Sequence, residues 1–369
     1  MNAISAPAVN ESLHWTEYGI PIRNLWYMLL YAWNEIPLIN SGELADAENA
    51  PTLDALLASV LMKLVQQRLR IGLGRNYIDE KYLLRGIRGR INFTDSLKNH
   101  AFEHGQAYCE FQQYSMNVPK NQIIRSTLMR LVQTGNFGVN RAMSDELRHN
   151  LRWLTRLLDG VDLIELKLDF IRRQQLGRND RDYRLMMAIC ELILMRQMPA
   201  DSEGQRKLPT LDHAALVMHN VYERFVANFY RTHLNGWDIT AQKRMGWHES
   251  SQSRYLPSMR PDLTLVEKSS GQIILLDTKF TAKSLATNQW GRESFDSSHL
   301  YQLYAYLKTQ EHLSDQHRQA KGILLYPSVN QSEISESINL QGQTMRVDTV
   351  DLTKAWQDIE HRLLKLIEE

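Results

Sequence analysis

The chain has 369 residues, of which 43% are hydrophobic and 23% are charged. This composition is typical of a globular protein and excludes a mainly disordered or fibrous chain. The 43 basic and 42 acidic residues give a net charge of +1. No overall field therefore marks a nucleic-acid binder, and any DNA binding must use a local basic surface. At roughly 150 residues per domain, the length predicts about two domains.

Targeting signals and cysteines limit the class further. No apolar run approaches the roughly 20 residues that a membrane helix needs. Residues 1–20 contain Glu11 and Glu17 and lack the basic start and apolar stretch of a signal peptide, so they are expected to form a loose terminus. Two cysteines, Cys109 and Cys190, cannot build a disulfide framework or a four-cysteine zinc site. These features predict a protein of the reducing cytoplasm without membrane contact.

Helical periodicity dominates the first half of the chain. Apolar spacing predicts helices over residues 23–33, 53–69, 122–133, 143–158 and 183–195. Between the second and third of these helices, four glycines interrupt an alternating stretch and predict short strands and turns. The mixture predicts a mixed α/β N-terminal domain over residues 21–200.

A polar stretch that contains Pro199 and Pro209 separates the two halves of the chain. Beyond it, the pattern predicts helices over residues 211–233, 298–310 and 353–366, and strands near 237–242, 261–266, 273–277, 322–326 and 345–352. A mixed sheet flanked by helices is an α/β arrangement. We therefore predict a second domain over residues 205–369.

The most informative segment is the predicted hairpin within residues 261–280. Four consecutive apolar residues indicate a strand buried on both faces, and Asp277 and Lys279 follow them. Because side chains alternate along a strand, these two are expected on one face, with Thr278 pointing away. The hairpin can bring Asp262 to the same face. A structural core has little reason to keep two carboxylates and a lysine together.

This cluster suits metal-assisted hydrolysis of a phosphodiester. Asp262, Asp277 and the main-chain carbonyl of Thr278 offer the hard oxygen ligands that Mg²⁺ prefers, and Mn²⁺ is an alternative ion. Lys279 would orient or activate the attacking water and offset the phosphate charge. Glu223, on the helix before the sheet, is a further candidate ligand, although a solvated helix carboxylate explains it equally well.

Two further features separate this segment from a second acidic-x-Lys tripeptide at Glu165–Lys167. Asp262 precedes Asp277 by 15 positions, a separation that a hairpin can close. Gln302 and Tyr306 lie four residues apart, on one face of the predicted helix over residues 298–310, where they could hold the DNA backbone or brace the site.

These residues resemble the motifs of the PD-(D/E)xK nuclease superfamily, and the Gln302-x-x-x-Tyr306 helix is similar to that of its RecB-like branch. Longer segments resemble the McrC family of the McrBC modification-dependent restriction systems. They are Pro21–Trp33, Gly86–Phe93, Asn121–Leu128, Leu276–Phe280 and Leu300–Leu307. The resemblance covers most of the chain from about residue 20.

The resemblance implies a restriction-endonuclease-like C-terminal domain in a subunit that does not act alone. In the family, McrB recognises methylated DNA and forms a GTP-hydrolysing AAA+ ring, and McrC docks on that ring, stimulates its GTPase and cuts double-stranded DNA. The chain has no GxxxxGK[ST] loop, so nucleotide is expected on the partner. Two alternatives remain, a non-catalytic adaptor that only activates the GTPase and a nuclease that works without a ring.

Overall fold

The computed structural model describes residues 19–35, 50–177, 180–197, 213–247, 255–256, 258–281, 286–287 and 293–368. The chain forms two compact units. We call them the sheet unit, Met1–Leu56 with Pro199–Glu369, and the helical unit, Leu57–Met198. No helix among the described residues is both long and apolar enough to cross a membrane.

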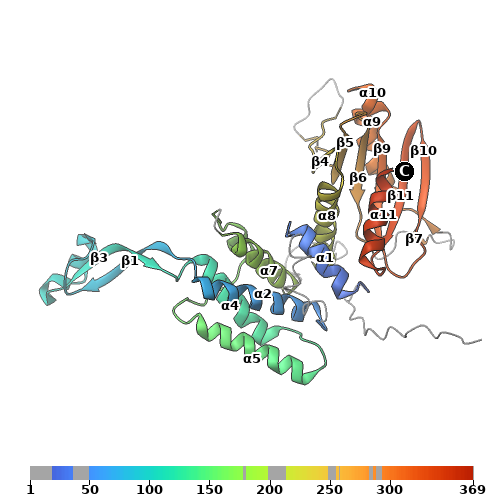
Figure 1. Ribbon diagram of the computed structural model, residues 1–369. Helices are drawn as coiled ribbons and strands as arrows, with labels where there is room; N and C mark the ends of the chain where they lie inside the picture. Colours follow the sequence, from blue (N-terminus) through green and yellow to red (C-terminus); the bar gives the residue numbers. More distant parts are fainter. Residues whose placement is uncertain are drawn as a thin grey trace, which may run out of the picture. The chain divides into compact units, whose positions relative to one another are not determined.

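A six-stranded mixed sheet, in the order β10-β11-β9-β6-β5-β4, forms the centre of the sheet unit (Figure 1). Its strands are β4 (Trp237–Ala241), β5 (Leu263–Glu267), β6 (Ile273–Thr278), β9 (Lys321–Ser328), β10 (Ser335–Leu340) and β11 (Gln343–Asp351). Strands β6, β9 and β11 run parallel, and the outer strands pair antiparallel. All residues of β6 are buried, as its continuous apolar run predicts.

Helices cover both faces of this sheet. Helix α9 (Ser297–Gln310) packs Leu303 and Leu307 against a cluster that includes Leu275 on β6 and Val347 on β11. Helices α8 (His213–His233) and α11 (Trp356–Glu368) lie on the opposite face, where the hydroxyl of Tyr230 donates to the carbonyl of Leu363 at 2.9 Å. The mixed α/β arrangement predicted for this part of the chain is thereby confirmed.

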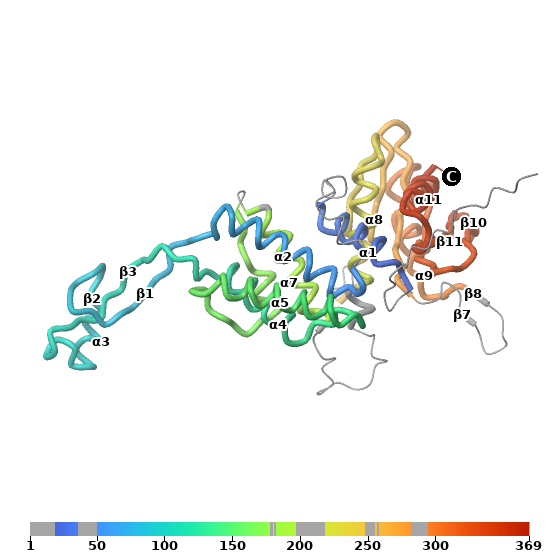
Figure 2. The backbone as a smooth tube through the Cα atoms, turned by 60° about the horizontal axis from the view of Figure 1, so that its bottom comes forward, coloured from blue at the N-terminus to red at the C-terminus, as the bar shows by residue number. Residues whose placement is uncertain are grey.

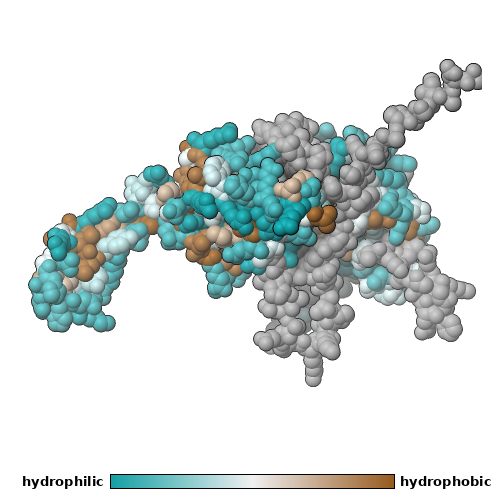
Figure 3. Space-filling model, turned by 90° about the horizontal axis from the view of Figure 1, so that it is seen from below, coloured by the Kyte–Doolittle hydropathy of each residue, from teal (hydrophilic) through white to brown (hydrophobic). Residues whose placement is uncertain are grey.

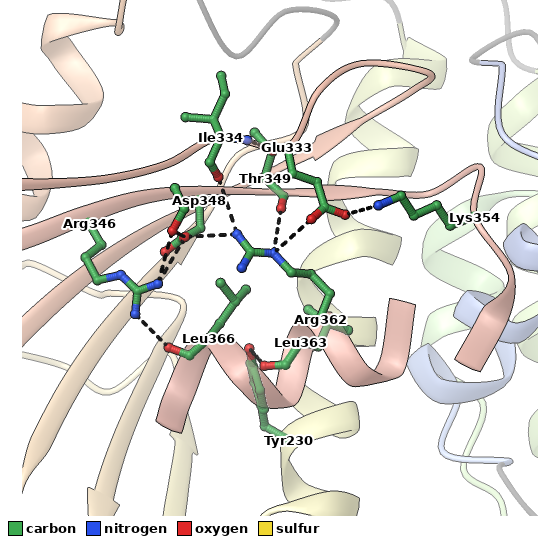
Figure 4. A network of polar contacts seen from close by, with 11 residues as sticks. Tyr230, Glu333, Ile334, Arg346, Asp348, Thr349, Lys354, Arg362, Leu363 and Leu366 are labelled. Atoms are coloured by element: carbon green, nitrogen blue, oxygen red, sulfur yellow. Dashed lines mark hydrogen bonds and ion pairs between the residues drawn. The ribbon is translucent and has the colours of Figure 1, made fainter. Parts of the chain in front are cut away.

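A buried charged network attaches α11 to the sheet (Figure 4). Asp348 on β11 is fully buried, and its Oδ1 accepts hydrogen bonds from Arg346 at 3.2 Å and Arg362 at 3.1 Å. Arg346 also donates to the carbonyl of Leu366 at 3.2 Å. Because a buried charge without a partner is costly, this network requires α11 to stay in one position on β11.

Helix α1 (Ile22–Ala32) belongs to the sheet unit, whereas the sequence places it in the predicted N-terminal domain. Nearly all of its residues are buried. Asn24 donates to the carbonyl of Leu352 at 2.8 Å, and the hydroxyl of Tyr31 lies 2.7 Å from Nε2 of His233. A helix that is apolar on almost every side must be enclosed by neighbouring elements, and these contacts with distant segments enclose it.

The helical unit contains a base of helices and a β-arm, shown as a tube in Figure 2. The base contains α2 (Leu53–Ile71) from Leu57 on, α4 (Pro119–Thr134), α5 (Arg141–Leu157), α6 (Leu168–Arg172) and α7 (Arg181–Gln197). The β-arm contains β1 (Asn76–Leu84), β2 (Arg90–Ile91), α3 (Phe93–Lys98), the 3-10 helix η3 (Ala101–His104) and β3 (Ala107–Ser115). The sequence predicted short strands and turns in its first part and missed β3.

Two of the segments that resemble the McrC family shape this β-arm. The buried Asn121 donates to the carbonyls of Gly74 and Met116, at 2.9 and 2.7 Å, and so ties together the two chain segments that enter and leave the β-arm. Gly89 has φ of +71°, and a Cβ there would collide with the carbonyl oxygen of Glu110. Only glycine fits this position without strain.

Apolar side chains are exposed along the β-arm. They include Tyr77, Tyr82, Ile87, Phe93, Leu97 and Tyr114. Figure 3 shows brown patches on this segment, at the left of the view. Exposed apolar side chains that gather on one segment are typical of a surface that meets a partner.

Candidate active site

Asp262, Asp277 and Lys279 meet at the carboxyl end of β6. Antiparallel pairing of Leu263 with Leu276 brings Asp262 beside Asp277. The two aspartates are 7% and 2% exposed, and the ammonium group of Lys279 forms an ion pair with Oδ2 of Asp277. The structure therefore brings together the three residues to which the sequence assigns the chemistry.

Thr278 lies against Asp262, which differs from the expectation that it points away. Its main-chain N–H and its hydroxyl both donate to Oδ2 of Asp262, at 2.7 and 2.6 Å. Asp262 precedes the first residue of β5, so its carboxylate is not held to the strict alternation of the hairpin. The two hydrogen bonds fix the orientation of this carboxylate.

Glu223 on α8 reaches this cluster through Gln242. Nε2 of Gln242 donates to Glu223 at 2.6 Å and to Oδ1 of Asp262 at 3.2 Å. Gln242 follows the last residue of β4 and has φ of 51°, a left-handed conformation. Sequence reasoning missed Gln242, because its only signal is its place at the end of a predicted strand.

Gln302 and Tyr306 form a chain of hydrogen bonds behind Lys279. The ammonium group donates to Oε1 of Gln302 at 2.9 Å, and Nε2 of Gln302 donates to the hydroxyl of Tyr306 at 2.6 Å. That hydroxyl donates to the carbonyl of Arg260 at 3.2 Å. Tyr306 is buried, whereas Gln302 is exposed to solvent.

Asp277 and Glu223 have raised pKa values. Burial raises the pKa of Asp277 to about 6, the charge of Asp262 adds to this shift, and Lys279 opposes it. Burial and the charge of Asp262 also raise the pKa of Glu223. Raised pKa values of neighbouring carboxylic acids indicate that their negative charges repel one another. A divalent cation between them would relieve this repulsion.

The oxygen donors at this place suit Mg²⁺. The carboxylates of Asp262 and Asp277, with the main-chain carbonyl of Thr278, are hard oxygen ligands. Among the described residues, no three side chains of His, Cys, Asp or Glu form a ready-made metal cluster. Two carboxylates and this main-chain oxygen could hold such an ion, and Gln242 connects Glu223 to Asp262 by hydrogen bonds.

The second acidic-x-Lys tripeptide lacks this setting. Glu165 and Lys167 form an ion pair of 3.3 Å, and their side chains are 81% and 68% exposed. They precede α6 and lie outside any strand. A solvated pair of this kind contributes little to stability and has no buried surroundings that would perturb its chemistry.

A comparison with known protein families agrees with the resemblance seen in the sequence. Residues 10–327 match the family described as McrBC 5-methylcytosine restriction system component. The chain belongs to this family. This McrBC-family chain is 29% identical over 354 residues to the Type IV methyl-directed restriction enzyme EcoKMcrBC of Escherichia coli (strain K12), over 95% of the chain and 98% of that relative.

Two solved structures are similar to the McrBC-family chain in part. One is a half-complex from a tetradecameric assembly of Thermococcus gammatolerans McrB AAA+ hexamers with bound McrC, with 15% identity, a TM-score of 0.49, and coverage of 94% of this chain and 76% of that chain. The other is the Thermococcus gammatolerans McrBC complex, with 16% identity, a TM-score of 0.35, and coverage of 56% and 57%. Both scores lie below 0.5, so neither likeness establishes a shared fold.

Proposed function

We propose that the chain is the DNA endonuclease subunit of a GTP-dependent, modification-dependent restriction complex, with a PD-(D/E)xK site that uses Mg²⁺. The observation that carries the proposal is the buried pair of Asp262 and Asp277 beside Lys279, at the end of a buried strand in an McrBC-family chain. A cluster this costly to bury is characteristic of a functional site rather than of a structural core.

Each residue of the cluster has a distinct task. Mg²⁺, when bound, would stabilise the charge that develops on the scissile phosphate. Asp262, Asp277 and the carbonyl of Thr278 hold the ion. Lys279 is fixed between Asp277 and Gln302, from where its ammonium group orients the attacking water and offsets the phosphate charge. Gln302, exposed on α9, is the residue of this chain of contacts that reaches the DNA backbone.

The proposal includes a partner, an AAA+ GTPase ring related to McrB, whose GTPase this chain stimulates. Family membership supports it, and the chain has no GxxxxGK[ST] segment of its own. The helical unit, with the exposed apolar side chains of its β-arm, is the docking element in this proposal. The name of the E. coli relative supports methylated double-stranded DNA as substrate. Two buried free cysteines agree with a place in the cytoplasm.

Reconstitution tests the proposal. The purified chain is incubated with methylated or unmethylated duplex DNA, GTP and Mg²⁺, with and without the proposed McrB-like GTPase. We expect cutting of methylated DNA only when partner, GTP and Mg²⁺ are all present. A stimulated GTPase without any cutting would support the non-catalytic adaptor, and cutting by the chain alone would support a nuclease that needs no ring.

A further inference from the structure

A pocket lies on the same face of the sheet as the two aspartates. Thr264 and Leu275, which pair across β5 and β6, line it, and they stand two residues along the strands from Asp262 and Asp277. Two residues of a strand span roughly 7 Å. The pocket is therefore a close neighbour of the candidate metal site and is separate from it.

The size and walls of the pocket suit a small, flat group. Its volume is about 210 Å³, below the roughly 300–1,000 Å³ of pockets that hold drug-sized ligands and well above the roughly 30 Å³ of one water. Aliphatic side chains of Ile273, Leu275 and Leu307 form its walls. Of the residues that the structure describes, no phenylalanine, tyrosine or tryptophan lines it, and His317 contributes an imidazole.

Thr264, which lines the pocket, carries a buried polar atom without a partner. Thr264 is 3% exposed, and its hydroxyl makes no hydrogen bond within the described part of the protein. A buried hydroxyl without a partner costs stability, so a ligand that reaches the Thr264 side chain and bonds to this hydroxyl would relieve that cost. A hydroxyl both donates and accepts, so it can pair with the edge of a heterocycle.

Two cations stand at the same pocket. Lys243 and Arg244 line it, and both are exposed. Across the described ranges, neither forms an ion pair or a hydrogen bond. They follow directly after Gln242, which contacts Asp262. Cations without carboxylate partners beside an aliphatic pocket favour a ligand that joins a phosphate to a flat apolar body.

We propose that this pocket receives one unpaired base of the DNA strand that is cut, with the adjoining phosphates on Lys243 and Arg244. The inference rests on the proposed nuclease function. The lining residues of β6, Leu275 and Ile273, stand two and four residues from Asp277, or roughly 7 to 13 Å. This span corresponds to about two to four nucleotide steps of 3.4 Å, so the base belongs to a nucleotide near the scissile phosphate. The energy of unstacking this base is offset by the hydroxyl of Thr264, the aliphatic walls and the two cations.

Fluorescence of a single-stranded oligonucleotide with one 2-aminopurine tests the proposal. The full chain is titrated in EDTA, which prevents cutting. We expect the emission to rise on binding, because the base leaves its stacked neighbours and enters a pocket that no described phenylalanine, tyrosine or tryptophan lines. Absence of any rise with the wild-type chain would overturn the proposal.

Charge variants test the role of the two cations at the pocket. The double substitution Lys243→Gln, Arg244→Gln should weaken binding about tenfold or more, and should lower the slope of log affinity against log salt by about 1.4, at about 0.7 for each lost phosphate contact. Lys268→Gln is the matched control, since it removes one charge from a lysine that pairs with Asp238 at 3.1 Å and does not line the pocket. Equal weakening by the control would overturn the assignment of Lys243 and Arg244 as phosphate contacts.

Pocket variants test the base. Thr264→Val keeps the shape and removes the unpaired hydroxyl, so it should raise the melting temperature while it reduces the 2-aminopurine signal. Gly246→Leu should reduce the signal, because Gly246 lines the pocket and a Cβ there meets no atom within 4 Å, so the added side chain takes up space beside the pocket. An unchanged signal in both variants would contradict the proposal.

Competition distinguishes the source of the nucleotide. An unlabelled oligonucleotide should displace the probe, whereas GTP and GMP at the same nucleotide concentration should not. Displacement by GTP or GMP alone would overturn the proposal in favour of a free-nucleotide site. The nuclease function is tested separately, by cutting of duplex DNA in the reconstituted complex, so that each proposal can fail without the other.

Discussion

Lys279, just after β6, and Gln302, on α9, are joined by a hydrogen bond of 2.9 Å from Nζ to Oε1. Gln302 is held in turn by the hydroxyl of Tyr306 at 2.6 Å, and that hydroxyl is anchored on the carbonyl of Arg260. The ammonium group that pairs with Asp277 is thus positioned by a helix packed on the sheet. Such support from rigid elements is what keeps a catalytic group in productive geometry.

Tyr306→Phe should loosen Lys279 without removing it. We expect kcat for DNA cutting to fall about 10- to 100-fold with KM little changed, because a misplacement of about 1 Å can cost about 100-fold. Tyr304→Phe on the same helix is the matched control, since its hydroxyl bonds to Gln341 and not to this chain of contacts. Steady-state cleavage with partner and GTP measures the effect. A loss of Mn²⁺ affinity as large as the loss of kcat would contradict a positioning role.

Lys279 and the two aspartates should respond differently to metal. Lys279→Ala should leave Mg²⁺ or Mn²⁺ affinity unchanged or tighter, because a neighbouring cation is removed, while cleavage collapses. Asp262→Asn and Asp277→Asn should weaken metal binding, because each removes an anionic oxygen ligand. Calorimetric titration of the three variants beside cleavage assays separates the roles. Wild-type cutting by Lys279→Ala, or unchanged metal binding by both aspartate variants, would show that the cluster is only an ion pair.

The pKa of Asp277 gives the metal-free protein a pH-dependent stability. Burial and Asp262 raise this pKa to about 6 from the ordinary 3.8. Between these values the folded protein keeps a proton that the unfolded chain has lost, so the free energy of unfolding decreases as pH rises through this window.

Asp277→Asn cannot titrate at this position and should lack that decrease. Relative to wild type, its free energy of unfolding should increase from pH 4 to pH 7 by about 1–3 kcal/mol. Urea unfolding in EDTA at several pH values measures this trend, and saturating Mg²⁺ at pH 7 should reverse the order, because it stabilises the ionised wild-type site. A difference that is independent of pH would contradict the account.

Asp348→Ala should destabilise the sheet unit. It leaves Arg346 and Arg362 without their shared buried carboxylate, and breaking a buried ion pair costs about 3–5 kcal/mol. Lys354→Ala is the control, because that lysine is 45% exposed and pairs with Glu333 at the edge of the same network, where loss of a pair costs about 0–1 kcal/mol. Urea unfolding of both variants compares the two costs, and equal destabilisation would contradict the role given to burial.

Well-buried elements could be predicted from the sequence, and the exposed strand β10 could not. Helices α1 and α9 and strand β6 lie within two residues of their predicted ends, because burial imposes a clear pattern on their sequences. Strand β10 was missed, since it is exposed along most of its length and so carries no apolar alternation.

At the site, what could be predicted depends on whether a contact is local or distant along the chain. Asp262, Asp277 and Lys279 could be predicted together, because alternation along a strand and the length of a hairpin are local properties. The membership of α1 in the sheet unit depends on contacts such as that of Asn24 with Leu352, which are 328 residues apart. The place of Gln242 depends on a left-handed turn after β4, and no spacing in the sequence indicates it.

Cutting and GTPase activity of Asp277→Ala, measured on the same samples of the reconstituted complex, test the central claim most directly. The carboxylate belongs to the sheet unit, whereas docking is assigned to the helical unit. We therefore predict that the folded variant cuts no methylated DNA and stimulates the partner's GTPase as the wild type does. Cutting at the wild-type rate, or loss of GTPase stimulation in a folded variant, would contradict the account.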